Sequence, residues 1–323
     1  MKQILILGAG MSGLCAARKL QRAGYGVCLV DKGRGIGGRM ATRRFEGGTF
    51  DHGAQFFTTR SDEFKTLLRE WEHNEVAGEW FRGYPSPEDK KPDDEHPRFR
   101  GSSGMTGIGK YMAEGLEVEL GEEIVSLSFE DGCWCATSKS GSHFEADELI
   151  LTAPVPQSLA LLDAAGVALP TATRETLEAL RYEPCFAVLA KLEGPSKIPP
   201  PGALYLESDI LAWVADNFQK GISEQEGSVT IHSTGDWAKA HFDDNKDEVA
   251  TKLLEAAAPL LCSKVVGYQV HRWRYSKPEN PLEIGHLRVA ELNLTFAGDI
   301  FQGAKIEGAA LSGLSAARAI IAD

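Results

Sequence analysis

The chain has 323 residues, a length typical of two domains, and its composition of 43% hydrophobic and 25% charged residues is that of an ordinary globular protein. Its formal net charge of −12 argues against binding to nucleic acids or to anionic membrane surfaces. No stretch approaches the roughly 18 apolar residues of a membrane span, and the N-terminus enters a predicted strand directly. We therefore expect a cytoplasmic protein.

The six cysteines do not predict a disulfide framework in a chain of this size. Cys15 and Cys28 fall inside the first predicted helix and the second predicted strand, where a thiol acts as a small hydrophobic group. Cys133 and Cys135 are separated by one residue and have no partner pair at metal-ligand spacing. We expect no metal site.

The first chemical signal lies in residues 4–20, ILILGAGMSGLCAARKL. Four apolar residues predict a strand buried on both faces, and Leu14, Ala17 and Leu20 follow at helical spacing. The turn between them has the spacing GxGxxG. In such a turn the first glycine permits the bend, the second lets a pyrophosphate approach and the third lets helix and strand pack closely. The alternative is a purely structural turn.

A second apolar run, residues 27–30, ends on Asp31. A carboxylate at the end of the second strand is placed to accept hydrogen bonds from both hydroxyls of an adenosine ribose. It would repel the 2′-phosphate of NADP, so the pattern favours NAD or FAD. The alternative for Asp31 is a plain surface acid.

The middle of the chain alternates helix and strand signals. Residues 83–98 contain four prolines and many charges and predict an exposed loop. Beyond it we expect a helix over 104–116, a β-meander over 118–154, helices over 171–180 and 246–260, and strands over 185–192, 211–217 and 228–233.

Residues 294–321 predict an apolar strand, a Gly-Asp pair, a glycine turn and a helix of small residues that can press closely on a sheet. The end of the chain should therefore rejoin the first domain. We expect a discontinuous FAD-binding domain, 1–60, 100–155 and 275–323, and a substrate domain, 61–99 and 156–274.

A second glycine-rich loop decides between the cofactors. Residues 32–57 contain Gly37-Gly38-Arg39, and Gly298-Asp299 stands near the other end of the chain. Together with GxGxxG and Asp31, this ordered set resembles the flavin-containing amine oxidase superfamily. The resemblance implies an α/β fold in which a Rossmann-type FAD-binding domain, as in p-hydroxybenzoate hydroxylase and the amine oxidases, is interleaved with an α+β substrate domain.

The predicted contacts with FAD follow its chemistry. Arg39 can meet the pyrophosphate as a bidentate fork, Asp299 can accept from ribityl hydroxyls, and main-chain N–H groups near Ile306 can stabilise charge at flavin N1 and O2. By resemblance, Ile124 offers its backbone to the adenine. The full predicted cofactor set is Gly8, Gly10, Met11, Ser12, Gly13, Asp31, Lys32, Arg39, Gln55, Phe56, Ile124, Asp299 and Ile306. Residues 298–313 contain no cysteine, so we expect FAD to be bound non-covalently.

Within the superfamily, the finer pattern resembles the renalases and extends over nearly the whole chain, including FDHGAQFF (50–57), WVADNFQK (213–220) and HRWRYS (271–276). This resemblance implies an oxidase of the 2- and/or 6-dihydro isomers of NAD(P). Hydride passes to flavin N5 and gives NAD(P)⁺, and dioxygen then reoxidises the flavin and yields hydrogen peroxide. The implied partners are this small-molecule substrate and O₂, with a monomer as the default.

Such a reaction needs orientation rather than a general base, because aromatisation of the dihydropyridine supplies the driving force. The predicted catalytic residues are Gln55, Trp213, His241 and Arg274. Trp213 can instead be a core aromatic, and Arg274 an ion-paired scaffold residue. The rival functions are an amine oxidase of a small amine and a non-enzymatic binding protein on the same scaffold, which would be expected to lose the phosphate-binding glycines.

Overall fold

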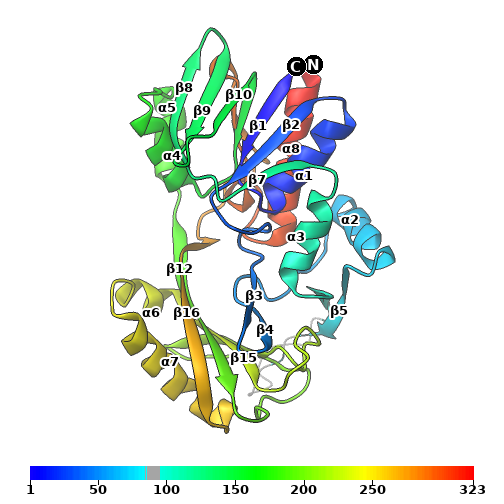
Figure 1. Ribbon diagram of the computed structural model, residues 1–323, viewed down its shortest axis with the longest axis vertical. Coiled ribbons are helices and arrows are strands. Elements are labelled where there is room, and N and C mark those ends of the chain that lie inside the picture. The colour runs from blue at the N-terminus through cyan, green and yellow to red at the C-terminus, as the bar shows by residue number, and fades with distance from the viewer. Residues whose placement is uncertain (84, 86–94) are drawn as a thin grey trace. The chain divides into compact units, whose positions relative to one another are not determined.

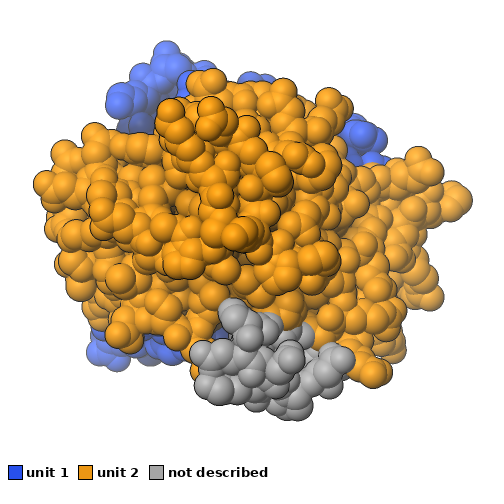
Figure 2. All heavy atoms as spheres, turned by 90° about the horizontal axis from the view of Figure 1, so that it is seen from below, with its two compact units in different colours: residues 1–38, 109–181, 278–323 blue, residues 39–108, 182–277 orange. Residues whose placement is uncertain are grey.

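The computed structural model describes residues 1–83, 85 and 95–323. The chain forms two compact units, which are coloured separately in Figure 2. Unit 1 comprises Met1–Gly38, Gly109–Arg181 and Pro278–Asp323, and unit 2 comprises Arg39–Ile108 and Tyr182–Lys277. These boundaries differ from the expected ones, since 39–60, 100–108 and 275–277 belong to unit 2 and 156–181 to unit 1. Which unit performs which function stays a prediction.

Unit 1 is built on a six-stranded sheet with the order β17-β18-β11-β1-β2-β7, in which β18, β11, β1, β2 and β7 are parallel and β17 is antiparallel. Figure 1 labels β1, β2 and β7 of this sheet. Its strands are β1 (Gln3–Leu7), β2 (Gly26–Asp31), β7 (Glu117–Leu120), β11 (Glu148–Leu151), β17 (Leu287–Val289) and β18 (Leu294–Phe296). The strands β1 and β11 are almost completely buried, as expected of continuous apolar runs in a parallel sheet. The predicted strand at residues 4–7 is confirmed.

An antiparallel sheet of β8 (Ile124–Glu130), β9 (Cys133–Ser138) and β10 (His143–Ala146) confirms the predicted meander. Helices α1 (Met11–Arg22) and α8 (Ile306–Ala322) pack against each other, and α4 (Val155–Ala164) and α5 (Thr171–Glu178) complete the unit with the short helical turns η1 (Ala290–Leu292) and η2 (Asp299–Phe301). The helix α3 (Met105–Ala113) spans the boundary between the two units.

The two ends of the chain meet in unit 1 through close backbone contacts. A Cβ added at Gly313 in α8 would lie 2.0 Å from the carbonyl oxygen of Ser12 in α1, so only glycine fits there. The buried carboxylate of Glu148 on β11 binds both Lys2 and Arg288, and Arg288 also pairs with Asp323. The prediction that residues 294–321 rejoin the first strands is therefore confirmed.

Unit 2 is built on a five-stranded sheet with the order β13-β14-β15-β12-β16. Its strands are β12 (Tyr182–Leu192), β13 (Ala203–Tyr205), β14 (Leu211–Asp216), β15 (Ser228–Ser233) and β16 (Val265–Pro278). Two hairpins, β3 (Thr42–Phe45) with β4 (Gly48–Asp51) and β5 (Ala77–Arg82) with β6 (Pro97–Gly101), and the helix α2 (Asp62–His73) complete it. The predicted loop 83–98 is wrong at its end, because Pro97 and Arg98 pair in β6; residues 84 and 86–94 lie outside the described residues.

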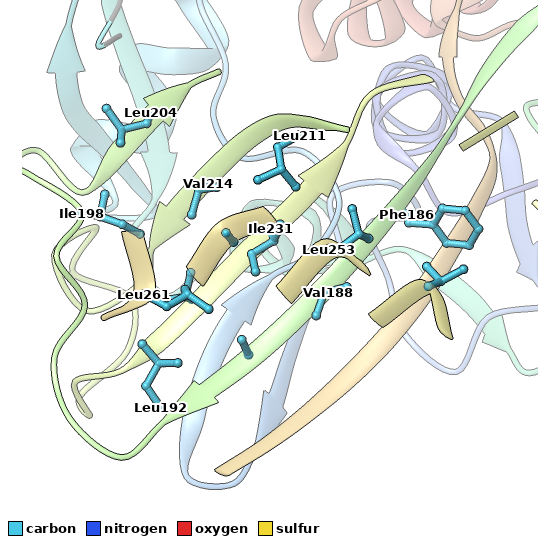
Figure 3. Packing of buried hydrophobic residues seen from close by; sticks show 14 of the residues in the cluster. Phe186, Val188, Leu192, Ile198, Leu204, Leu211, Val214, Ile231, Leu253 and Leu261 are labelled. Atoms are coloured by element: carbon cyan, nitrogen blue, oxygen red, sulfur yellow. The ribbon is translucent and has the colours of Figure 1, made fainter. Parts of the chain in front are cut away.

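One face of this sheet, here called the helix face, is covered by α6 (Gly235–Ala240) and α7 (Lys246–Leu261). Alternate residues of β12, such as Phe186 and Val188, pack there with Ile231 of β15 and Leu253 of α7 (Figure 3). Because side chains alternate along a strand, the intervening residues point to the opposite face. It is here called the open face because α6 and α7 do not cover it, although β4 packs against β15 there and buries part of it. The two faces therefore carry different chemistry.

We predict that Gly313→Ala destabilises the protein by at least about 1–3 kcal/mol, because the added methyl group overlaps the Ser12 carbonyl oxygen and forces α1 and α8 apart. Thermal unfolding of the purified variant measures the loss. Gly78→Ala is the control, since an added Cβ there meets no atom within 4 Å. An unchanged midpoint for Gly313→Ala would show that the two helices are not held together at this contact.

Candidate active site

The three glycines of the first turn have three different surroundings. Gly8 has φ +118°, a conformation that side chains disfavour, and a Cβ there would lie 2.3 Å from Thr152 Oγ1. A Cβ at Gly13 would lie 2.0 Å from the carbonyl oxygen of Gly8, so helix and strand are in direct contact. A Cβ at Gly10 meets no atom within 4 Å. Gly10 is therefore the position where another molecule can approach the backbone.

The N-terminus of α1 fits an anionic ligand. Gly10 is the N-cap, and no side chain caps the helix. Met11 and Ser12 form its first turn, and the buried Ser12 hydroxyl has no hydrogen-bond partner within the described part of the chain. Unpaired N–H groups at a helix N-terminus favour phosphate. An orphaned hydroxyl beside them supplies one more donor for a pyrophosphate.

Asp31, the last residue of β2, ties this turn to the strand end. Its Oδ2 accepts a hydrogen bond from Ala9 N and its Oδ1 accepts one from Gly33 N, each at 2.7 Å. Each carboxylate oxygen keeps a second lone pair for a ribose hydroxyl. The neighbouring Lys32 instead donates to Gln157 Oε1 at the surface.

The C-terminal motif lies in the same unit. Gly298 N donates to Ser312 Oγ at 2.8 Å, and Asp299 is buried at the start of η2. Ile306 begins α8, whose N-cap Lys305 makes no side-chain cap, so this helix also has uncapped N–H groups. Ile124 begins β8. The donors, the open glycine and the acid in unit 1 fit an adenine dinucleotide.

The remaining predicted residues belong to unit 2. Arg39 donates from Nη1 to the carbonyl oxygen of Ser276 at 3.2 Å and to that of Tyr275 at 3.5 Å. Gln55 is buried and its Nε2 donates to the carbonyl oxygens of Asp51 and Gly53. Its Oε1 has no partner among the described residues. An unused acceptor on a fixed amide is suited to receive a hydrogen bond from a ligand.

Phe56 and Trp213 lie together in an aromatic cluster on the open face. Their ring centroids are 5.6 Å apart, and Trp213 also contacts Tyr205 at 4.6 Å and Phe81 at 6.5 Å. The indole Nε1 of Trp213 is buried and, within residues 1–83, 85 and 95–323, unpartnered. The open face thus presents both an unused acceptor, on Gln55, and an unused donor.

His241 and Arg274 lie on the helix face instead. His241 stacks on Trp237 at 4.4 Å and its Nδ1 pairs with Asp244 at 2.7 Å. The guanidinium of Arg274 lies 4.2 Å from the ring centre of Phe242, which packs on Phe186. The four predicted catalytic residues therefore form two separate groups, with Gln55 and Trp213 on the open face.

The sequence did not single out a cluster of histidines on the open face. His52 lies against His271 at 4.9 Å and Trp273 at 5.5 Å, while Trp273 Nε1 donates to the carbonyl oxygen of His52 at 2.8 Å. His271 and Trp273 are two residues apart on β16, and Arg272 between them reaches Phe186 on the helix face. The alternation of side chains along a strand, applied to HRWRYS (271–276), could have predicted that His271 and Trp273 point to the face opposite Arg272.

Burial keeps these histidines uncharged. It lowers the pKa of His52 to about 3, assisted by the nearby His271 and Arg43, and lowers the pKa values of His232 and His271 to about 4. The imidazoles on the open face are therefore neutral at pH 7. Lys220 is a fully buried cationic side chain on that face; it pairs with Asp51 and was likewise not singled out.

A parallel sheet whose first strand leads through GxGxxG into an uncapped helix, with an acid ending the second strand, defines a dinucleotide-binding protein. The chain matches the family model described as NAD(P)-binding Rossmann-like domain over residues 6–71, and the model described as flavin containing amine oxidoreductase over residues 92–321. The chain therefore belongs to the flavin-containing amine oxidoreductase family. It is a flavin-dependent oxidoreductase with FAD as its cofactor.

Individual relatives agree with this assignment. The chain is 29% identical to renalase from Mus musculus in an alignment of 293 positions that covers 86% of this chain and 85% of that protein. A shorter match, 35% identical over 86 residues, covers 26% of this chain and 17% of an L-amino acid dehydrogenase from Synechocystis sp.. The chain is a renalase-like member of its superfamily.

Solved structures show the same fold. Cyclohexylamine oxidase from Brevibacterium oxydans superposes with a TM-score of 0.76 at 15% identity, covering 99% of both chains. Putrescine oxidase superposes with a TM-score of 0.72 at 17% identity, covering 100% of this chain and 99% of that one. The predicted α/β architecture with a Rossmann-type FAD-binding domain is confirmed. In addition, no helix among the described residues is long and apolar enough to span a membrane.

We predict that Gly10→Val abolishes FAD binding without unfolding the apoprotein, because a Cβ at this position meets no described atom of the protein within 4 Å. Gly13→Val is the matched comparison and should lower the stability of the apoprotein itself, since its Cβ overlaps Gly8. Flavin absorbance after reconstitution measures binding, and thermal unfolding of the apoproteins measures stability. A yellow Gly10→Val protein with wild-type affinity would remove Gly10 from the cofactor site.

A pH prediction follows from His52. Its pKa is about 3 in the folded protein against 6.5 as its ordinary value, so the unfolded chain binds the proton more tightly. The stability of the neutral form is complete above pH 6.5 and is lost as the pH falls towards 3, at up to about 1.4 kcal/mol per pH unit. His52→Gln should make the loss between pH 6 and 4 shallower in urea unfolding. An unchanged slope would contradict the burial of a neutral imidazole.

Proposed function

We propose that the protein oxidises dihydro isomers of NAD(P), with the ring reduced at carbon 2 or carbon 6, to NAD(P)⁺. The similarity to renalase along 86% of the chain carries this proposal, since the renalase resemblance implies such a substrate. Bound FAD would supply a hydride acceptor at N5, and the reduced flavin, with one further proton from water, would reduce dioxygen to hydrogen peroxide. We expect the FAD to be held non-covalently, and the protein to be a cytoplasmic monomer; all three expectations stay predictions.

In this proposal the chain's own residues orient the substrate. Aromatisation drives loss of the hydride, so no side chain needs to take a proton from carbon. The carboxamide of a nicotinamide offers one N–H donor group and one carbonyl acceptor, and the unpartnered Gln55 Oε1 and Trp213 Nε1 offer the complementary pair. Phe56 supplies an aromatic surface beside Trp213. We propose that Gln55 and Trp213 contact the nicotinamide ring of the substrate through its carboxamide group.

His241 and Arg274 are not part of this proposal. Their partners Asp244, Trp237 and Phe242 account for them as packing residues of the helix face. In unit 1, Gly10, Ser12 and Asp31 are the residues proposed to hold the pyrophosphate and ribose of FAD. Arg39 would meet the pyrophosphate, and Asp299 and the α8 N-terminus at Ile306 would meet the ribityl chain and the flavin.

Oxidation of a small amine is the second candidate. The fold shared with cyclohexylamine oxidase and putrescine oxidase favours it, as does the aromatic cluster of Phe56, Tyr205 and Trp213. Aromatic faces attract a cationic or methylated amine. The two candidates differ in the substrate that reduces the flavin.

We predict that anaerobic mixing with 2- or 6-dihydro-NAD(P) bleaches the flavin absorbance within seconds and releases NAD(P)⁺. Ordinary NADH, reduced at carbon 4, should reduce it at least about 100-fold more slowly, because the wrong ring carbon faces N5. Readmission of air should restore the absorbance and yield one hydrogen peroxide per turnover. Rapid bleaching by an amine, with none by the dihydro isomers, would establish the second candidate instead.

A further inference from the structure

Lys220 is a fully buried lysine in the open face of unit 2. Its ammonium donates to Asp51 Oδ2 at 2.6 Å and to the carbonyl oxygen of Gln55 at 2.5 Å. The ring centre of Trp80 lies 4.7 Å from Nζ. Burying a charge of this kind is unfavourable unless it is paired and hydrogen-bonded, and the carboxylate, the carbonyl and the aromatic face meet that need.

The carboxylate that receives this ammonium is itself fixed. Asp51 Oδ1 accepts from the Thr42 hydroxyl and from Met105 N at 2.9 Å, and its main-chain N–H donates to Asn217 Oδ1 at 3.3 Å. The main-chain oxygen of Asp51 accepts from Thr230 Oγ1 and from Gln55 Nε2. The ion pair therefore has one position rather than a range of them.

Lys220 connects the fixed carboxylate of Asp51 to the segment 54–57 through hydrogen bonds. Ala54 N donates to the carbonyl oxygen of Arg39 at 2.8 Å, and Phe57 N donates to that of Phe99 at 2.9 Å. Between these two anchors, the Lys220 ammonium donates to the main-chain carbonyl oxygen of Gln55, and the main-chain oxygen of Asp51 accepts from the Gln55 side-chain amide. Removing the ammonium would leave a buried carbonyl without its donor, and the peptide that joins Gln55 to Phe56 would be free to turn.

We propose that Lys220 is a positioning residue, which fixes the peptide between Gln55 and Phe56 and so sets how these two side chains meet flavin and substrate. This inference rests on the proposed function, in which Gln55 and Phe56 make those contacts. A purely structural role is the alternative, in which the ammonium only neutralises Asp51. The two roles predict different results when both charges are removed together. If the ammonium only neutralises Asp51, the flavin site should be unchanged; if it positions the peptide, the site should change.

The double variant that combines Asp51→Asn with Lys220→Met makes that separation. Lys220→Met alone would leave a buried carboxylate without its cation, a strongly destabilising change. In the double variant the introduced asparagine is uncharged and the introduced methionine keeps the bulk of the lysine stem, but no donor reaches the Gln55 carbonyl. Leu253→Ala is the control for lost stability, because Leu253 is fully buried on the helix face, away from this network.

We expect the double variant to bind FAD but to change the visible circular dichroism of the bound flavin. Its flavin reduction at saturating dihydro-NAD(P) should slow at least about tenfold, since small errors of position are costly to hydride transfer. Leu253→Ala should lower the thermal midpoint and leave both the dichroism and the rate at wild-type values.

Wild-type dichroism and rate in the double variant would overturn the positioning role. So would a change of dichroism as large in Leu253→Ala, since general loosening would then explain the effect. Failure of every dihydro isomer to reduce the wild-type flavin would overturn the proposed function, and the dichroism of the two variants would still decide the role of Lys220.

Discussion

The contact between Gly313 and Ser12 is the constraint on which unit 1 depends. The backbone of α8 approaches the backbone of α1 so closely that a methyl group has no room, and Gly13 repeats this arrangement against β1. These contacts join residues from the two ends of the chain at the turn that carries Gly10, the glycine proposed to approach a pyrophosphate. The helix N-termini, the acid and the open side of Gly10 keep their positions because that backbone is fixed.

Unit 2 depends on a different principle, the alternation of side chains across one sheet. Apolar residues of β12, β14 and β15 pack under α6 and α7, and their neighbours in sequence supply the open face. That face buries an ion pair, neutral histidines and unpartnered polar atoms, all of which are unfavourable to bury without a purpose. We propose that these groups serve the flavin-dependent reaction, since a reaction of this type needs fixed donors, acceptors and aromatic surfaces.

The predicted site residues fall into two groups, those placed by local backbone geometry and those placed by the order and faces of a sheet. Residues of the glycine turn, Asp31 and the Gly298-Asp299 motif could be placed from the sequence because each depends on local geometry at a strand end or a helix start. Trp213 and Arg274 could not be told apart, since both are large residues of strands. Only the places of β14 and β16 in the sheet, and the face to which each side chain points, put Trp213 beside Phe56 and Arg274 beside Phe242.

The sequence by itself determined the cofactor class, the parallel strands and the return of the chain's end to its beginning, because glycine spacing and apolar runs act over a few residues. The tertiary structure alone decided that Lys220 meets Asp51 across 169 positions, and that His52 lies against both His271 and Trp273. Such contacts depend on strand order and register, and these follow from the packing of the whole unit rather than from any local pattern.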